Sequence, residues 1–388
     1  MERGGTIGAL TRARRPKDRK QQILSAASVC FHEVGYHNVS MADIAGAVGI
    51  TAGALYRHFR DKQSLLDSAV SDSFERLYAV TSAGGGLDAM LTRLAEGTVH
   101  GRELGLLWER EARHLPAANQ QVLRRRFREV NQRLAEGIGE HRAELSAADA
   151  DLLGWAVLCA LGSTAHHTVE LDVPVLVAMT SAICAVRLPD AGEAATPPGD
   201  TAGLAPVSRR EALLAAATRL FGEHGYQSVS MAEIGAAAAI AGPSVYNHFA
   251  SKTEILLAAL NRGTEALWLD LHEVLRVATS HGHALDLLVD GHVRFALRHR
   301  QLMGALVTEI GNLPLAERNQ VRMAQRELIT EWVSLLRAHR PELSQRDAHL
   351  RVRGALIVIA DVARTPHLVR GPAVAGRLGA VARALLFT

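Results

Sequence analysis

The fold is decided by FHEVGYHNVSMADIAGAVGITAGALYRHFRDK (residues 31–62), which returns as FGEHGYQSVSMAEIGAAAAIAGPSVYNHFASK (residues 221–252). Between 23–70 and 213–260, 20 of 48 positions are identical without a gap. This spacing is too long for the unit of a solenoid, so the repeat predicts two copies of a whole domain. The chain has 388 residues, and two domains of about 190 residues each agree with ordinary domain sizes.

The similarity between the copies continues beyond these stretches. HRAELS at 141–146 returns as HRPELS at 339–344, and the offset between the copies has grown from 190 to 198 residues. Residues 189–208 separate the copies and contain four Pro, three Gly and no aromatic residue. A segment of this composition is not expected to form a core, so we interpret it as a linker between two duplicated halves.

Composition and periodicity favour an all-α fold. Apolar residues make up 48% of the chain and aromatic residues only 4%, while Ala, Leu, Arg and Glu dominate. Apolar residues recur at i, i+3 and i+4, and no long stretch alternates with period two. The predicted helices lie near 21–35, 41–48, 52–58, 63–81, 87–99, 101–114, 117–143, 147–169 and 173–187, and in the second half at 344–369 and 372–386.

The chain gives no sign of several other protein classes. The N-terminus has no apolar segment typical of a signal peptide, and the longest apolar run is too short to span a membrane, so we expect a soluble cytoplasmic, nucleoid-associated protein. The three cysteines have no paired spacing, and no histidine pair has a third ligand at a convincing distance in sequence, so we expect no metal site and no cofactor. No nucleophile elbow, P-loop or zinc-protease motif indicates an enzyme.

Residues 31–62 predict a helix-turn-helix. The inward-facing apolar residues of a first helix are Leu24, Ala27, Val29 and Phe31. That helix ends at Gly35, and Ser40 is well placed to cap a short second helix. Gly49 allows a tight turn, and Thr51 caps a third helix at 52–58. Two short helices joined by such a turn are typical of DNA-binding domains.

The cations are unevenly distributed along the chain, although the net charge is only +3. Residues 1–70 carry ten Lys and Arg against six Asp and Glu, and six of these cations lie between Arg12 and Lys20. Residues 205–260 carry four of each sign. A basic arm at one end indicates nucleic acid as a partner, and a merely solvated terminus is the alternative interpretation.

The string S-M-A-D-I-A…G-I-T-x-G-x-L-Y-R-H-F-x-x-K resembles the DNA-binding domain of the TetR/AcrR family of transcriptional regulators, and here it occurs twice in register. The resemblance implies that each half has an N-terminal helix-turn-helix head and a C-terminal helical bundle for ligand binding and dimerisation. The predicted domains are a basic arm at 1–16, a head at 17–77, a bundle at 78–188, a linker at 189–206, a second head at 207–267 and a second bundle at 268–388.

The resemblance also implies roles for individual residues of the first copy. Phosphate contacts are expected from Ser40, Tyr56 and Lys62, and base contacts from Thr51, Gly53 and Arg57, with His58 suited to either. The arm is expected to contribute Arg14, Arg15 and Lys17. The counterparts in the second copy are Arg209, Arg210, Ser230, Gly242, Pro243, Ser244, Tyr246, Asn247, His248 and Lys252.

The second copy departs from the family pattern at several of these positions. Ala241 lacks the hydroxyl of Thr51, and Asn247 replaces Arg57. Pro243 stands where the family often has Gly. A neutral Asn can read adenine, but the contribution of phosphate contacts must be smaller. Either the second head reads a different half-site or it contributes little to binding.

The family resemblance further implies a small hydrophobic effector, such as a lipid, a sterol or an acyl-CoA-like molecule. Candidate pocket residues are Trp108, Trp155, Cys159, His166, His292 and Asp361. Ordinary core packing is the alternative for the tryptophans and the cysteine. Asp361 follows an apolar run and needs a partner if it is buried, which Arg364 one turn later can supply.

The resemblance implies a transcriptional repressor that an effector releases from a double-stranded DNA operator, acting as an intramolecular pseudo-dimer or a homodimer. RRPKDRKQQIL, IAGPSVY and DVARTPHLVR resemble a tandem member of the family, which implies control of lipid or sterol uptake and catabolism genes. The alternative is an adaptor or sensor in which only the first helix-turn-helix binds DNA.

Overall fold

The computed structural model describes residues 16–102, 111–167, 169–189, 206–370 and 373–388, and within these ranges it contains helices and no strand. The fold is therefore all-α, as the periodicity predicted. Half one, before the linker, contains α1 (Pro16–Val34), α2 (Met41–Ala47), α3 (Ala52–Tyr56), α4 (Lys62–Ser82), α5 (Gly86–His100), α7 (Ala117–His141), α8 (Ala147–Gly162) and α9 (Val173–Ala185).

Half two repeats this order after the linker. It contains α10 (Arg209–His224), α11 (Met231–Ala237), α12 (Gly242–Val245), α13 (Lys252–Val277), α14 (His281–Arg298), α15 (Arg300–Thr308), α16 (Leu315–His339), α17 (Gln345–Arg364) and α18 (Val374–Phe387). Short 3-10 helices are η1 (Tyr36–Asn38), η3 (Ala112–His114), η4 (Ser163–His166) and η5 (Ile310–Asn312). None of the helices described here combines the length and the apolar character that a membrane crossing requires.

Two predicted helices end earlier than the periodicity suggested. The helix predicted at 344–369 stops at Arg364, because Thr365 precedes Pro366 and the residue before a proline is disfavoured in helical geometry. The helix predicted at 147–169 stops at Gly162 and continues as η4. Most of the predicted helix 101–114 and of the linker lies outside the described residues.

The first head has its own small core. Head one, consisting of α1 to α3 and the start of α4, buries Leu24, Ala27 and Phe31, as predicted. Val29 was wrongly predicted to face inward and is 44% exposed. It lies two residues after Ala27, about 200° around the helix, so it cannot share the buried face. Ile23 completes that face instead.

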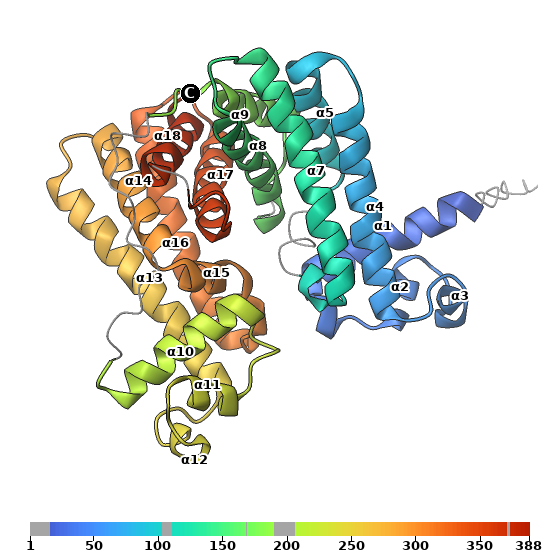
Figure 1. Ribbon diagram of the computed structural model, residues 1–388, viewed down its shortest axis with the longest axis vertical. Coiled ribbons are helices and arrows are strands. Elements are labelled where there is room, and N and C mark those ends of the chain that lie inside the picture. The colour runs from blue at the N-terminus through green and yellow to red at the C-terminus, as the bar shows by residue number, and fades with distance from the viewer. Residues whose placement is uncertain (1–15, 103–110, 168, 190–205, 371–372) are drawn as a thin grey trace, which may run out of the picture.

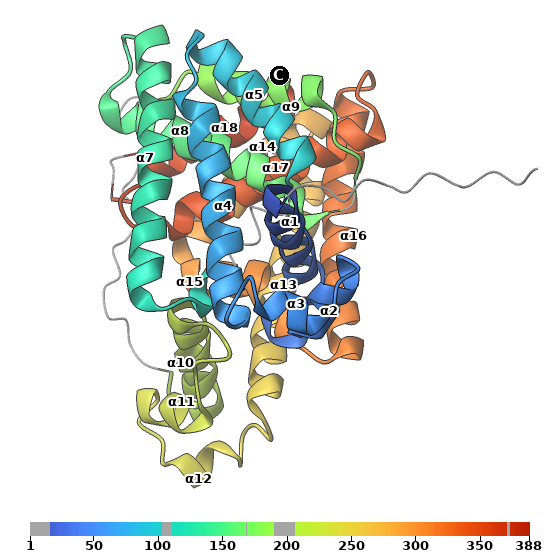
Figure 2. The same ribbon diagram turned by 90° about the vertical axis from the view of Figure 1, so that its right-hand side faces the viewer.

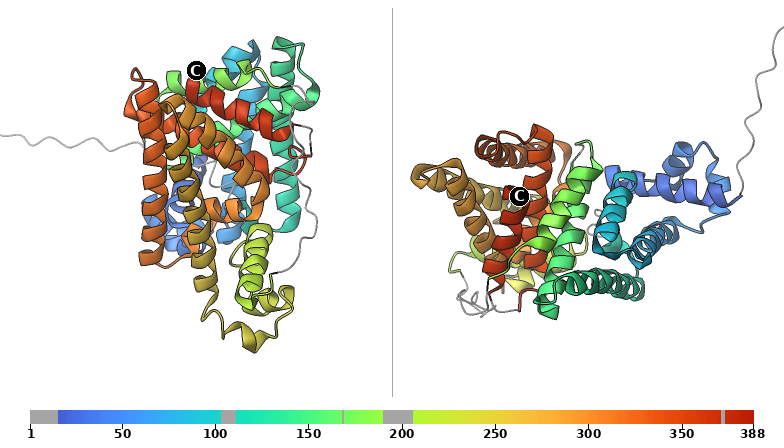
Figure 3. Two further views of the ribbon diagram at one scale, coloured as in Figure 1. Left: turned by 90° about the vertical axis from the view of Figure 1, so that its left-hand side faces the viewer. Right: turned by 90° about the horizontal axis from the view of Figure 1, so that it is seen from above.

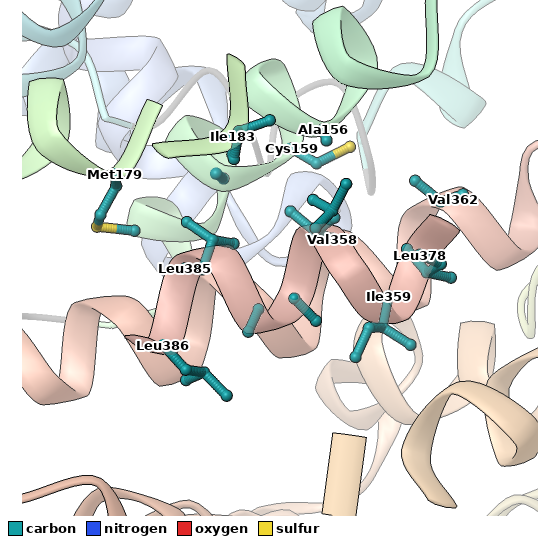
Figure 4. Packing of buried hydrophobic residues seen from close by; sticks show 14 of the residues in the cluster. Ala156, Cys159, Met179, Ile183, Val358, Ile359, Val362, Leu378, Leu385 and Leu386 are labelled. Atoms are coloured by element: carbon teal, nitrogen blue, oxygen red, sulfur yellow. The ribbon is translucent and has the colours of Figure 1, made fainter. Parts of the chain in front are cut away.

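The two halves pack against each other through four helices. α8 and α9 of half one contact α17 and α18 of half two. Figure 4 shows Cys159 and Ile183 of half one close to Val358 and Leu385 of half two. One apolar cluster runs through both halves without interruption. A Cβ on Gly354 of α17 would lie 2.8 Å from Met179 Cε, so this glycine lets the Met179 side chain of half one pack closely on α17.

Polar contacts between the halves surround this apolar interface. Arg377 and Asp149 form a largely buried ion pair at 3.0 Å. His367 Nε2 lies 3.2 Å from Asp151 Oδ2. Arg353 donates a 2.9 Å hydrogen bond to the carbonyl of His166. These contacts fix the register of one half on the other in addition to the apolar packing.

In Figure 1, head one lies at the right, where α3 is labelled, and head two lies at the bottom, with α12 at the lowest point. Figure 2 shows the same arrangement after a quarter turn, with α2 and α3 above α11 and α12. Seen from above, the halves lie side by side, with the green helices of half one against the red helices of half two (Figure 3). Head two consists of α10 to α12 and the start of α13.

Candidate nucleic-acid interface and ligand cavity

The turn between α2 and α3 is fixed by caps at both helix starts. Ser40 Oγ accepts the backbone N–H of Asp43 at 3.1 Å, and Asp43 Oδ2 accepts the N–H of Ser40 at 2.8 Å. Thr51 Oγ1 accepts the N–H of Ala54 at 3.2 Å. Gly49 has a φ of 69°, in the left-handed region that favours glycine. The predicted roles of Ser40, Gly49 and Thr51 in the turn are therefore confirmed.

One face of α3 is open to solvent. Leu55 is fully buried, whereas Tyr56 is 53% exposed and Arg57 and His58 are also exposed. A Cβ on Gly53 would meet only Thr51 Oγ1, at 4.0 Å, so the helix start presents bare backbone. The helix ends at Tyr56, two residues before the predicted end. A short helix with this surface can approach the edges of bases in a major groove.

Lys62 occupies a different environment from the one the sequence suggested. Its ammonium donates to the carbonyls of Tyr36 and Val39 at 2.7 and 2.8 Å, and it lies 4.5 Å from the centre of the Tyr36 ring. Burial lowers the pKa of Lys62. An ammonium has three donors and these bonds use two, so the lysine braces the segment between α1 and α2. The phosphate contact expected of it stays a prediction.

A buried carboxylate joins each head to its bundle, which sequence reasoning missed. Glu111 Oε2 accepts the backbone N–H of Tyr36 at 3.1 Å, and Glu309 Oε2 accepts that of Tyr226 at 3.3 Å. Both glutamates are only 1% exposed. The signal was available in the sequence, because the two glutamates lie 198 residues apart, which is the offset between the duplicated bundles.

Head two is held together by the same kinds of contact as head one. Ser230 and Glu233 form the same capping box as Ser40 and Asp43. The Lys252 ammonium donates to the carbonyls of Tyr226 and Val229 at 2.8 and 2.7 Å. Arg210, expected to contact DNA, lies with its guanidinium 4.4 Å from the centre of the Phe249 ring. The frame of the head is thus built from the same kinds of contact in both copies.

Head two differs in the turn and in α12. Ala239 takes the position of Gly49 and has a φ of 54°, a conformation that costs a residue with a Cβ about 1 kcal/mol or more. Ala241 offers no side-chain cap, and α12 has four residues with Pro243 near its start. Tyr246 is 59% exposed, and Asn247 and Pro243 are exposed beside it. Gly242, Ser244 and His248 are half-buried.

Some of the remaining predicted DNA-contact residues lie outside the residues that the structure describes. Arg14 and Arg15 lie outside the described residues, and Lys17 lies in the first turn of α1. Arg209 is the exposed first residue of α10. Within the described ranges, no cluster of three or more metal-binding side chains occurs.

Two segments of the chain, 23–69 and 213–259, match the family profile described as "Bacterial regulatory proteins, tetR family". The chain carries two TetR-family domains. These TetR-type domains coincide with the two heads, including both capping boxes and both lysine braces. The profile ends near the middle of α4 and of α13, helices that continue from the heads into the bundles.

Several known regulators resemble the TetR-type heads. The chain is 38% identical over 77 residues to the HTH-type transcriptional repressor Rv1474c of Mycobacterium tuberculosis, covering 20% of this chain and 41% of the relative. It is 36% identical over 87 residues to the HTH-type transcriptional activator FasR of Mycolicibacterium smegmatis, covering 22% and 40%. These matches span about two-fifths of each relative's length.

Solved structures of bacterial transcriptional regulators align with about half of the chain. One is a TetR-family transcriptional regulator from Bordetella parapertussis, with a TM-score of 0.44, 19% identity, and coverage of 47% of this chain and 96% of that chain. Another is the ketosteroid transcriptional regulator KstR2 of Mycobacterium tuberculosis, with a TM-score of 0.42, 22% identity, and coverage of 46% and 94%.

A cavity of about 1160 Å³ lies beside the interface of the halves. Its walls include four of the six predicted pocket residues, namely Trp155, Cys159, His166 and Asp361. Asp361 forms an ion pair with Arg364, as the sequence suggested. Trp108 lies outside the described residues. His292 is not among the residues lining this cavity: it is buried beside Trp332, and burial lowers its pKa to about 4.

Proposed function

We propose that this chain is a transcriptional repressor in which both TetR-type heads bind one DNA operator and a small effector causes release. The observation that carries the proposal is the presence of two heads in one chain, joined through bundles that pack on each other. Each head has an exposed Tyr at the end of a short helix, which is capped in head one and contains a Pro in head two. The effector must bind the DNA-incompetent arrangement more tightly, with a coupling of about 1–3 kcal/mol.

The two heads are proposed to form an intramolecular pseudo-dimer. A helix-turn-helix pair reads half-sites about 34–36 Å apart, one helical turn of DNA. Relatives with one head need two chains for this, whereas here α3 and α12 belong to one polypeptide. Arg57 and Asn247 occupy equivalent positions in the two heads but differ in side chain. Because these side chains favour different bases, we expect an operator with unlike half-sites.

The regulated genes are proposed to serve lipid or sterol uptake and catabolism. This part rests on the resemblance of RRPKDRKQQIL, IAGPSVY and DVARTPHLVR to the mycobacterial repressor of the third mammalian-cell-entry operon. An apolar cavity wall that includes Leu94, Phe127 and Trp155 supports a largely hydrophobic effector. Transcript profiling of a deletion strain, in which lipid-transport genes rise, tests this part separately.

The stoichiometry on DNA tests the central proposal. An operator selected from a random DNA pool with the full chain is expected to contain two different half-sites, and native mass spectrometry is expected to find one chain per operator. Two chains on each minimal operator with identical half-sites would favour an intermolecular dimer with four heads. No selected sequence at all would refute DNA recognition.

One observation favours a second function, in which head two does not bind DNA. Ala239 is strained, α12 lacks a side-chain cap and the head has few cations. The chain is then an adaptor or sensor that binds DNA through head one alone. Footprinting separates the two functions, because an adaptor protects one half-site and is unaffected by Tyr246→Ala.

A further inference from the structure

The cavity is built by both halves of the chain. Half one contributes residues from α4, α5, α7 and α8, including Leu77, Leu94, Phe127 and Leu158. Half two closes it with the end of α17 and residues 365–370. Trp155 of half one and His367 of half two meet edge to face, with ring centres 5.4 Å apart. A ligand in this space therefore touches both halves at once.

The described lining of the cavity is strongly basic. It contains seven arginines and three histidines, but Asp361 is its one carboxylate. The arginines are Arg76 of α4, Arg93 of α5, Arg102, Arg124 and Arg128 of α7, Arg364 of α17, and Arg370. Among them, Arg76 pairs with Asp72, and Arg364 pairs with Asp361.

Other arginines of the lining bond to neutral groups. Arg93 Nε donates to the carbonyl of Val80 at 3.3 Å. Arg128 Nε donates to the carbonyl of Arg124 at 3.4 Å. A carbonyl satisfies a donor but does not neutralise a cation, so the positive potential in the cavity persists.

We propose that this shared cavity binds an amphiphilic anion, with an apolar body against the leucines and aromatic rings and a carboxylate or phosphate group against the arginines. The inference rests on the proposed function, because it names the chemical class of the effector. Arginine suits such a group, since its guanidinium can form two parallel hydrogen bonds to a carboxylate or phosphate.

The position of the cavity connects it to both heads. α4, which carries the cavity residues Ser73 and Leu77, is also the last helix of head one. On the other side, a Cβ on Gly304 of α15 would lie 3.2 Å from Arg364 Cδ, so Arg364 packs against α15. α15 ends beside Glu309, which holds Tyr226 of head two. A ligand that moves α4 away from Arg364 acts on both heads together.

Three probes of one chain length test the inference: palmitate, palmitoyl-CoA and 1-hexadecanol, each titrated below its aggregation threshold into the full-length protein without DNA. We expect palmitate or palmitoyl-CoA to bind at least about tenfold more tightly than the alcohol, because a charge-assisted hydrogen bond is lost in the alcohol. Binding of palmitate alone identifies a carboxylate ligand, and binding of palmitoyl-CoA alone identifies a phosphate-bearing one.

Paired substitutions locate the site. Arg128→Ala combined with Arg370→Ala is expected to weaken anion binding by about tenfold or more and to leave alcohol binding unchanged. The control is Arg125→Ala on the same helix, a side chain that is 69% exposed, pairs with Glu129 and is not among the cavity residues. Near-equal affinity for all three probes, no binding of either anion, or an equal loss in the control overturns the inference.

A gel shift with the selected operator separates this inference from the proposed function. Release of DNA by palmitate or palmitoyl-CoA, lost in the double variant, supports both. Release by the uncharged alcohol alone keeps the repressor proposal and refutes the anionic ligand. Anion binding that leaves DNA affinity unchanged refutes the role as effector, although the site itself stands.

Discussion

Heads one and two agree in the contacts that hold each head together and differ in the turn and the exposed helix that follows it. Both have the capping box, the lysine that braces the segment after the first helix, and the buried glutamate that bonds a Tyr N–H. They differ in the turn residue, in the cap of the exposed helix, and in Arg57 against Asn247. Two heads in one polypeptide need not be alike, so the DNA-facing positions can diverge while the frame stays the same.

The largest expected difference between the heads comes from the arm. Removal of residues 1–15 deletes four arginines, for which head two has only Arg209 and Arg210 as counterparts. We expect operator affinity to fall about tenfold or more and the slope of log K against log salt to flatten by up to about 3.6, since each phosphate contact contributes about 0.9. Fluorescence anisotropy over a salt series measures both.

A matched variant with the four arginines replaced by lysine keeps the charge and is expected to bind within a few-fold of the original. An unchanged salt slope after the deletion would show that the arm is merely solvated.

The second comparison is Arg57→Ala against Asn247→Ala. Arg57→Ala is expected to weaken operator binding and to reduce the salt slope by about 0.9 for each phosphate contact that it makes. Asn247→Ala is expected to leave the slope unchanged and to cost about 1–3 kcal/mol of discrimination at one base pair. Repeating the operator selection with each variant shows which half-site changes. Equal losses with equal slopes would contradict this division of roles.

The third comparison exchanges the turn residues. Ala239→Gly is expected to stabilise head two by about 1 kcal/mol, because glycine adopts a positive φ without a steric cost. Gly49→Ala is expected to destabilise head one by a similar amount, even though a Cβ there has no neighbour within 4 Å. Hydrogen exchange of peptides covering α2–α3 and α11–α12 measures each head separately. Faster exchange in Ala239→Gly would show that Ala239 is not strained.

The smallest expected effect concerns the helix caps. Thr51→Ala removes the hydrogen bond to Ala54 N–H and is expected to cost head one about 1 kcal/mol. Ala241→Thr is expected to raise the free energy of unfolding of head two by about half that amount, because α12 is one residue shorter than α3. The same exchange experiment applies, with Thr51→Ser as the control that retains the cap. No difference between Thr51→Ala and Thr51→Ser would exclude a role for this cap in stability.

Sequence reasoning succeeded where the cause is local. Ser40, Gly49 and Thr51 act on atoms within a few residues of themselves, so their spacing alone predicted the turn. The all-α fold followed from apolar periodicity, which reports burial directly. The end of α17 at Arg364 could also have been predicted, from Pro366.

The sequence could not reveal contacts that depend on tertiary packing. Glu111 and Tyr36 are 75 residues apart, and the duplication marks Glu111 and Glu309 as equivalent without indicating that each bonds a Tyr N–H. The seven cavity arginines come from separate segments of both halves, and only the packing of the halves brings them around one cavity. His292 has the chemistry of a ligand contact but lies on the buried face of α14, where apolar neighbours hold it neutral.

The packing of α8 and α9 on α17 and α18 affects how a cell can use this protein. In a dimer of separate chains, the concentration of the active dimer rises with the square of the subunit concentration when that concentration is low. Here the complementary surface belongs to the same polypeptide, so dilution does not part the two halves. With one chain on each operator, as proposed, we expect operator occupancy to rise in direct proportion to copy number at low abundance, and an inactive copy to leave intact copies unaffected.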